Sequence, residues 1–240
     1  MVMEHVDYPA WADFVWYLID SHLAKNRSGA SEELNILELG AGTGLLTKEL
    51  LVQGFGHVTV TDGSSEMLER AGERLSSFEK RIELCELDFE GEWEGLEKTY
   101  DVILLMYDGF NYARSDEAID RILSGMAQHL APDGIALFDQ STPANSINNA
   151  AFFEDEGALG KTKYIRKSSF DIEVGLHTTE FEITTPDGDF LERHVQRAWT
   201  RKQVNEAVGR SGLVVAAAYD GFSLDPADDD AERIHWVLKH

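Results

Sequence analysis

Short apolar runs alternate with amphipathic stretches over the first 140 residues of the chain. The runs have the length of buried strands, and they predict strands at Ile36–Leu39, His57–Thr61, Ile82–Leu87, Tyr100–Met106 and Ile135–Phe138. The amphipathic stretches repeat apolar residues every three or four positions, and they predict helices over residues 9–24, after Leu45, after Ser64 and from Ser115 to Leu130. Strands that alternate with helices indicate an α/β fold with a parallel sheet.

The pattern changes in the second half of the chain. Polar residues 139–149 predict a loop that leads into a short helix over Asn149–Glu156. Residues 163–174, 176–185 and 190–199 are rich in Thr, Ile, Val and Phe, and turn residues separate them, so they predict an antiparallel meander. Two further apolar runs, Leu213–Ala218 and Ile234–Leu238, complete the core sheet as an antiparallel pair. We therefore expect one domain over residues 1–240, with a cap inserted at about residues 161–199.

Charge and cysteine content narrow the range of partners. The 240 residues include 44 acidic and 21 basic side chains, which gives a formal net charge of −23. Nucleic acids and anionic membranes require clustered Lys and Arg, so neither is an expected partner. A salt-rich cell, the steering of cationic acceptors and solubility alone remain open as reasons for the acidity. Cys85 is the only cysteine, and we recognise no secretion signal or membrane span, so we expect a cytoplasmic protein. The sequence leaves the oligomeric state open.

A glycine-rich segment, ILELGAGTGLLT, follows directly from the first predicted strand. Gly40, Gly42 and Gly44 alternate ahead of a helix, and glycine lets backbone N–H groups approach a ligand closely. A tight turn between a strand and a helix is the alternative for the glycines alone. Leu45 stands near the place of the last glycine in a dinucleotide fingerprint, which weakens an interpretation as an NAD site.

Two carboxylates frame this segment. Glu38 lies inside the apolar strand, where a carboxylate is costly without a partner. Asp62 ends the next strand, at the offset at which an acidic side chain binds ribose hydroxyls. With these residues the sequence resembles the class I S-adenosylmethionine-dependent methyltransferases, whose first motif is an acidic residue followed by x-G-x-G-x-G, with a second carboxylate closing the next strand. The resemblance implies a Rossmann-like seven-stranded sheet with helices on both faces and S-adenosylmethionine as the cofactor.

The resemblance also implies roles for individual residues. Asp62 would hold the ribose, Asp88 would receive the adenine amino group, and the backbone N–H of Phe89 would meet a ring nitrogen; a turn-forming Asp is the alternative for Asp88. The run DGSSEML resembles the family's D-x-S-x-x-M-L, but Gly63 replaces the usual apolar residue against adenine, so Met67 or a later residue would supply that contact. The predicted cofactor-binding residues are Glu38, Gly40, Ala41, Gly42, Gly44, Asp62, Gly63, Met67, Asp88, Phe89, Met106 and Asp108.

The acceptor side carries a second family pattern. YDVILLMYDGFNY resembles the F-D-x-x-x-x-x-F-D-S-x-N-Y pattern of small-molecule methyltransferases, in which an added sheet covers the cofactor and shapes the acceptor pocket. Alternation along the last meander strand places Glu192, His194 and Gln196 on one face. His194 is therefore the predicted catalytic residue, with Tyr107 as a second candidate; a structural sheet histidine and a core tyrosine are the alternatives. No His, Cys and Asp cluster has zinc spacing, so no metal is expected.

The sequence thus predicts methyl transfer from S-adenosylmethionine to a nitrogen or oxygen of a small-molecule acceptor by direct displacement. A base is needed only where the acceptor must lose a proton. Two other function classes are the alternatives. The spacing of the third glycine disfavours an NAD(P)-dependent oxidoreductase, and the meander argues against a non-catalytic module that only binds the cofactor.

Overall fold

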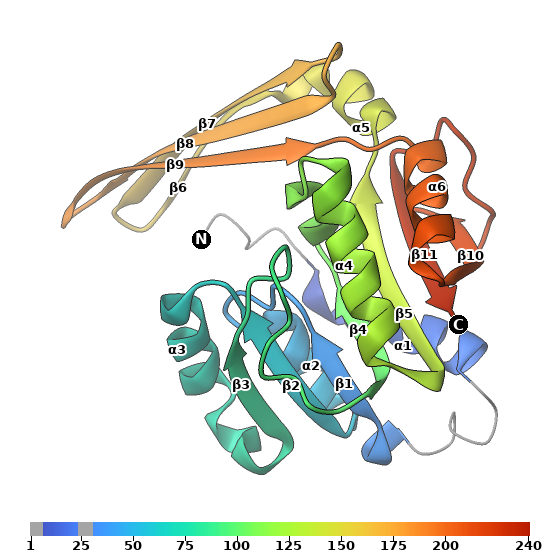
Figure 1. The fold of residues 1–240 in the computed structure, drawn as a ribbon. Coiled ribbons are helices and arrows are strands. Elements are labelled where there is room, and N and C mark those ends of the chain that lie inside the picture. Colours follow the sequence, from blue (N-terminus) through green and yellow to red (C-terminus); the bar gives the residue numbers. More distant parts are fainter. Residues whose placement is uncertain (1–6, 24–30) are drawn as a thin grey trace.

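The computed structural model describes residues 7–23 and 31–240, and one seven-stranded sheet forms its core (Figure 1). The strand order is β10-β11-β5-β4-β1-β2-β3. Strands β1 to β5 pair in parallel, whereas β11 lies antiparallel between β5 and β10, as predicted. The strands are β1 (Asn35–Glu38), β2 (His57–Asp62), β3 (Ile82–Glu86), β4 (Tyr100–Leu105), β5 (Leu130–Ser141), β10 (Val214–Asp220) and β11 (Arg233–Lys239).

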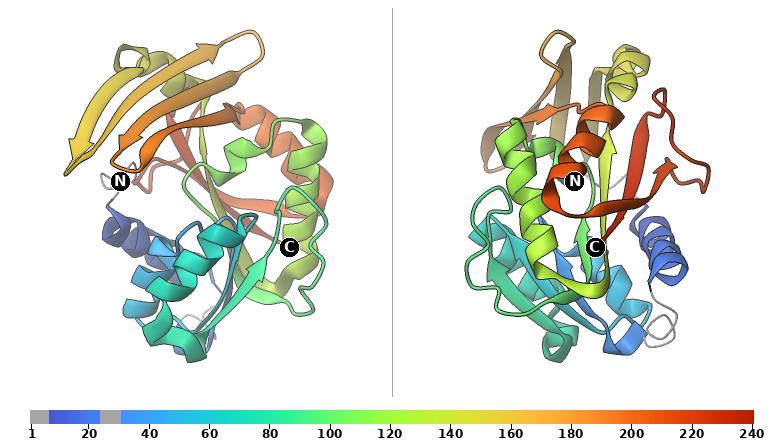
Figure 2. Two further views of the ribbon diagram at one scale, coloured as in Figure 1. Left: turned by 90° about the vertical axis from the view of Figure 1, so that its left-hand side faces the viewer. Right: turned by 45° about the vertical axis from the view of Figure 1, so that its right-hand side comes forward.

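Helices cover both faces of this sheet, which confirms the predicted layers (Figure 2). One face is covered by α1 (Tyr8–His22), α2 (Leu45–Val52) and α3 (Ser65–Arg74), and the other by α4 (Asp116–His129) and α6 (Arg201–Ser211). Because both faces are covered, every residue of β4 is buried. Among the described residues, no helix has the length and apolar character needed to cross a membrane.

Side chains that the sequence marks as helix caps set where the helices begin. Ser64 accepts a hydrogen bond from the backbone N–H of Met67 at the start of α3, and Ser115 starts α4 in the same way. Thr200 and Gln203 form a capping box at α6. The helix expected over residues 9–24 ends at His22, and residue 24 lies outside the described residues. Short helical turns complete the chain: η1 (Ser31–Glu33), η2 (Ser76–Arg81), η3 (Gly109–Tyr112), α5 (Pro143–Asn148) and η4 (Ala150–Phe152).

A second, antiparallel sheet forms the cap above the carboxyl ends of the core strands (Figure 1). Its order is β6-β7-β8-β9, with strands β6 (Glu154–Leu159), β7 (Thr162–Asp171), β8 (Leu176–Thr185) and β9 (Gly188–Arg197). It is inserted between β5 and α6. The cap thus begins at residue 154 and not at about 161, and the predicted helix over 149–156 is confirmed only as the short turn η4, because β6 takes up residues 154–156. The acidic first strand is paired opposite basic residues of β7, Glu154 with Lys167 and Asp155 with Arg166, and such cross-strand pairing is invisible to local periodicity.

The predicted loop over residues 139–149 is also wrong, because β5 continues to Ser141 and α5 follows. Asp139 and Gln140 are fully buried in the strand. The polar groups of Gln140 are satisfied by distant partners: its amide donates to the Trp199 carbonyl (2.8 Å), and its oxygen accepts from the Trp236 indole (2.9 Å). A polar segment can therefore remain a buried strand, since its side chains are hydrogen-bonded.

The strand order determines where a ligand can enter. From β1 the chain builds the sheet outward through β2 and β3, and then returns to place β4 on the other side of β1. This reversal opens a crevice beyond the carboxyl ends of β1 and β4, the usual binding place in open α/β sheets. The glycine segment follows β1, and the YDGFNY segment follows β4, so both motifs meet at this crevice.

Candidate active site

The glycine loop after β1 is held by backbone hydrogen bonds to the neighbouring strands. Gly40, Gly42 and Gly44 all have left-handed φ angles of 60°, 56° and 71°, a conformation that other residues adopt only under strain. The N–H of Ala41 donates to the Thr61 carbonyl (2.8 Å). A Cβ added at Gly42 would meet no atom within 4 Å, so this part of the loop borders open space. The loop therefore leaves room for a ligand against the backbone at Gly42, beside the start of α2.

Asp62 and Glu38 are both engaged at this loop. The carboxylate of Asp62 accepts from the N–H of Gly42 (2.8 Å) and from that of Ser64 (2.9 Å). Buried Glu38 accepts a hydrogen bond from the Thr47 hydroxyl, which is the partner that its apolar surroundings require. Burial raises the pKa of Glu38 to about 7, and the charge of Asp62 acts in the same direction, whereas the Thr47 hydrogen bond opposes the shift. The two predicted carboxylates thus bind the glycine loop and the first turn of α2 through hydrogen bonds.

The residues predicted to contact adenine lie next to the glycine loop, after β3. A Cβ on Gly63 would lie 3.9 Å from the Cα of Asp88, and one on Gly40 would lie 3.1 Å from the Phe89 ring. The Asp88 carboxylate accepts from the N–H of Glu90 (2.9 Å), so the turn-forming role is present, and the adenine role stays a prediction. Met67 is 39% exposed at the start of α3.

The segment after β4 takes part in a partly buried ion-pair network that the sequence did not indicate. Tyr107 and Asp108 have φ angles of 61° and 58°, which are uncommon without glycine. Arg233 of β11 binds the carboxylates of Asp108 (2.5 Å) and Asp139. Asp139 is fully buried, and burial raises the pKa of its carboxyl while the Arg233 charge lowers it. The carboxylate of Asp108, predicted to bind the cofactor, is thus engaged by Arg233.

Tyr107, the second catalytic candidate, is packed among aromatic rings. Its ring centroid lies 4.3 Å from that of Trp11 and 5.1 Å from that of Tyr8. The hydroxyl is buried and has no hydrogen-bond partner among the described residues. Burial raises the pKa of Tyr107 far above its usual range, so the phenol remains protonated and is a donor, not a base. Met106, just before it, is buried in the same core.

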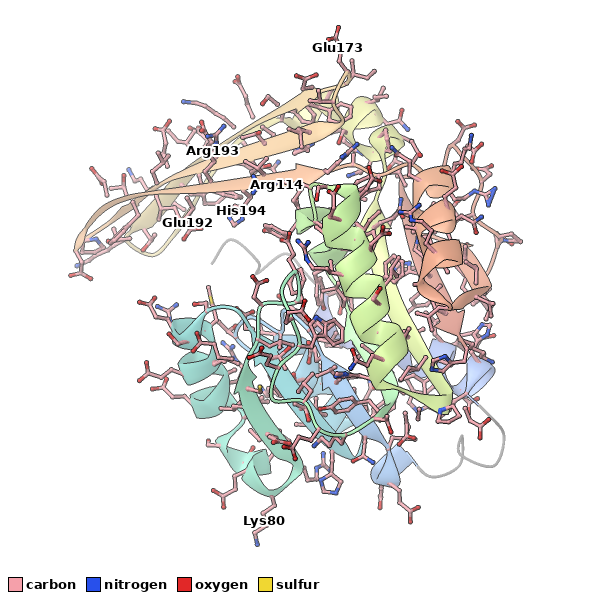
Figure 3. The ribbon with its side chains drawn as sticks, in the orientation of Figure 1. Lys80, Arg114, Glu173, Glu192, Arg193 and His194 are labelled. Carbon is pink, nitrogen blue, oxygen red and sulfur yellow. The ribbon has the colours of Figure 1, made fainter. Side chains whose placement is uncertain are left out.

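His194 lies on the face of β9 that is turned toward the core, as the alternation predicts. Figure 3 shows Glu192 and His194 on the core side of β9 and Arg193 on the other. His194 Nδ1 is 2.8 Å from the Tyr112 hydroxyl, and Gln196 donates to the Asp108 carbonyl (3.2 Å). The His194 side chain remains 39% exposed. The cap therefore touches the YDGFNY segment directly.

A second histidine, His177 of β8, lies deeper in the same junction. A cavity of about 130 Å³ between cap and core is lined by His177, Gln196 and Asp108, among others. His177 Nδ1 is 2.9 Å from the Ser146 hydroxyl of α5. Sequence reasoning missed His177. The sequence indicated that Gln196 lies on the same face of β9 as His194. The β8–β9 register, which places His177 opposite Gln196, is visible only in the structure.

Comparisons with known proteins agree with this geometry. Residues 36–134 match a family described as a methyltransferase domain. A protein of Geobacillus sp. named as a methyltransferase is 26% identical over 248 residues, which cover 99% of this chain and 95% of the relative. An S-adenosylmethionine-dependent methyltransferase structure from Clostridium acetobutylicum superposes with a TM-score of 0.82 at 21% identity, covering 100% of this chain and 94% of that one. The structure of an amino pentose methyltransferase from Micromonospora echinaspora gives 0.71 at 18%, covering 98% and 92%. These findings confirm the predicted fold.

Proposed function

We propose that this chain, a class I S-adenosylmethionine-dependent methyltransferase, transfers a methyl group to a nitrogen or oxygen atom of a small-molecule acceptor by direct displacement. The observation that carries the proposal is the position of the cap, which contacts the segment after β4 through His194 and Gln196. That segment borders the glycine loop, because β1 and β4 are neighbours in the sheet. An acceptor enclosed under the cap would therefore lie at the edge of the cofactor site.

The residues of the loop fit S-adenosylmethionine. The open space at Gly42 accepts the close approach of a ligand to the backbone, and Asp62 and Asp88 stand at the ends of neighbouring strands, where ribose and adenine contacts would form. Gly40 and Phe89 would border the ring, with Met67 on the open side. When bound, the cofactor would supply a methyl group on a sulfonium: an acceptor nucleophile would bond to the methyl carbon as the carbon–sulfur bond breaks, and the electron pair would return to sulfur, the leaving group.

The residues of the chain contribute alignment and dehydration. The cap and the core enclose a small polar cavity, and holding two reactants in one geometry supplies much of the acceleration in such displacements. A cavity of about 130 Å³ suits a small acceptor group and does not suit a duplex. The net charge of −23 also opposes binding of polyanions. Among structural neighbours, the Micromonospora enzyme acts on an amino pentose, which supports a small-molecule acceptor here.

Calorimetry with S-adenosylmethionine and NADH, side by side, tests the cofactor assignment. We expect binding of S-adenosylmethionine only. Binding of NADH alone would favour the alternative function, an NAD(P)-dependent oxidoreductase. Transfer of a tritiated methyl group to a panel of amines, hydroxy acids and phenols then tests catalysis. Cofactor binding without transfer to any class would favour a non-catalytic module, and label found only on nucleic acid would overturn the small-molecule assignment.

A further inference from the structure

The cavity at the junction of cap and core has a distinct chemical character. The core contributes Asp108, Ser141 and Ser146 to its wall, and the cap contributes His177, Thr179 and Gln196. Each of these side chains is polar, although aromatic residues are plentiful elsewhere on the cap. A cavity with this lining recognises its ligand by hydrogen bonds and charge, not by apolar contact.

Several of the lining groups already have partners, and those partners decide what remains for a ligand. The Gln196 amide donates to the Asp108 carbonyl (3.2 Å), and the Thr179 hydroxyl is 3.0 Å from that of Ser168. The Gln196 oxygen and His177 Nε2 have no hydrogen bond within residues 7–23 and 31–240. The Asp108 carboxylate adds negative charge to the wall, and Arg233 is shared between it and buried Asp139. The free groups are therefore suited to a cationic hydrogen-bond donor.

We propose that this cavity binds the acceptor as a primary or secondary ammonium group and that His177 removes its proton before methyl transfer. The inference rests on the proposed function and specifies its acceptor. In this arrangement His177 Nδ1–H donates to Ser146 Oγ, which leaves the lone pair of Nε2 for the proton. The amine nitrogen, now neutral, forms the new bond to the methyl carbon as the carbon–sulfur bond breaks. The product leaves as the methylated ammonium, and the imidazolium returns its proton to water.

The surroundings of His177 keep its imidazole neutral. Phe153 and Phe170 pack beside the ring, with centroids 5.1 and 6.3 Å away. Burial lowers the pKa of His177, the positive charge of Arg166 lowers it further, and the Asp108 charge opposes both. At neutral pH the ring is therefore unprotonated and able to accept a proton.

His194 provides a matched comparison on the same sheet. In the register of β8 and β9, His177 faces Gln196 and His194 faces Thr179, so both imidazoles lie on one face of the cap. His194 does not belong to the described lining of the cavity, and its Nδ1 is engaged by Tyr112. Its half-exposed position makes it a rim residue. The same substitution at the two histidines therefore decides which of them removes the proton, and Arg193→Gln on the outer face of β9 controls for general damage to the cap.

The experiment compares His177→Gln with the rival candidate His194→Gln and with the control Arg193→Gln, each in the full-length protein. Tritiated methyl transfer is measured with a panel of amines, each paired with the alcohol or phenol of the same skeleton, and the best amine is used for kinetics. We expect label on amines only, and a fall in kcat of about 10²–10⁴-fold for His177→Gln, the usual contribution of a positioned acid or base. In the native protein we expect kcat/KM to fall at acid pH as His177 is protonated, and this fall should be absent in His177→Gln, while S-adenosylmethionine affinity measured by calorimetry stays nearly unchanged. His194→Gln tests the rival catalytic candidate and should lose less activity than His177→Gln, whereas Arg193→Gln on the outer face of β9 is the control and should retain most of the activity.

A measurement without turnover provides a second readout. Nitrogen-15 spectra of the histidine rings, assigned by loss of one signal in His177→Gln, should show His177 with its proton on Nδ1. A proton on Nε2 at neutral pH would overturn the proposed role. An equal or larger fall in kcat for His194→Gln would also overturn the role of His177, and so would label found only on alcohols. Absence of S-adenosylmethionine binding would instead contradict the proposed function. Cofactor binding with no labelled amine would overturn the ammonium assignment alone.

Discussion

The glycine loop and the junction between cap and core are held in place by different kinds of contacts. The backbone of the loop is the donor in its contacts with β2, as in those of Ala41 N–H with the Thr61 carbonyl and of Gly42 N–H with the Asp62 carboxylate. The junction is held by side chains far apart in the chain, such as Tyr112 with His194 and Asn111 with the Arg197 carbonyl. Backbone contacts tolerate changes of side chain, whereas the junction depends on each residue that forms it. The cofactor half is therefore constrained by chain geometry, and the acceptor half is free to be specified by side chains.

Replacing residues 154–197 by a short Gly-Ser linker tests this division most strongly. We expect turnover to fall by more than about 100-fold, because alignment and dehydration of the acceptor are lost. S-adenosylmethionine binding, measured by calorimetry, should remain, since the loop makes its contacts within the core. Arg193→Ala on the outer face, which breaks only an exposed pair with Glu180, serves as the control and should change little. Full activity without the cap would contradict its role.

Substituting Arg233 tests the side-chain network at the junction. Arg233→Met leaves the carboxylate of Asp139 buried without its cation. We expect a loss of about 3 kcal/mol in the free energy of unfolding, at the lower end for a broken buried pair because the Arg233 side chain is 26% exposed. Urea denaturation measures the loss. Arg210→Met breaks an exposed pair with Asp120 and should destabilise the fold far less than Arg233→Met; similar losses in the two variants would show that burial does not matter here.

Asp62→Ala examines the cofactor half. It removes the acceptor of the Gly42 and Ser64 N–H groups and the proposed ribose contact. We expect S-adenosylmethionine binding to weaken by about 1–3 kcal/mol, the typical cost of unmet polar partners. Asp62→Asn retains an oxygen acceptor, so its affinity for S-adenosylmethionine should lie between those of the native protein and Asp62→Ala. Calorimetric affinities identical to that of the native protein in both variants would contradict the assignment of Asp62.

The pH dependence of stability provides the smallest effect when it is counted per pH unit. The pKa of Glu38 is raised by burial from 4.5 to about 7 in the folded chain. Between these values the folded state holds a proton that the unfolded state has lost, so the contribution of Glu38 is present below pH 4.5 and is lost as pH rises toward 7. Relative to Glu38→Gln, the native protein should lose about 1 kcal/mol per pH unit across this range. Parallel curves from urea denaturation would show that Glu38 titrates normally.

Local sequence was sufficient for the cofactor half. Alternating apolar runs predicted the parallel strands, and Ser64, Ser115 and Thr200 marked helix starts that the structure confirms. The glycine motif and Asp62 could be recognised because their geometry is set within about 20 residues of chain and by backbone conformation. The roles of Asp62 and Asp88 toward the cofactor stay predictions.

Only the tertiary structure decided the acceptor side. Asp139 lies in a polar segment that the sequence suggested was a loop, but pairing with β11 and an ion pair with Arg233 bury it. His177 carries no local signal, since its position over the cavity follows from its register with β9 and from Ser146 of α5. The acidic strand β6 is likewise placed opposite basic residues of β7 by the strand register. Local periodicity reports which face of an element is apolar, whereas the partners of a polar side chain are set by contacts between distant segments.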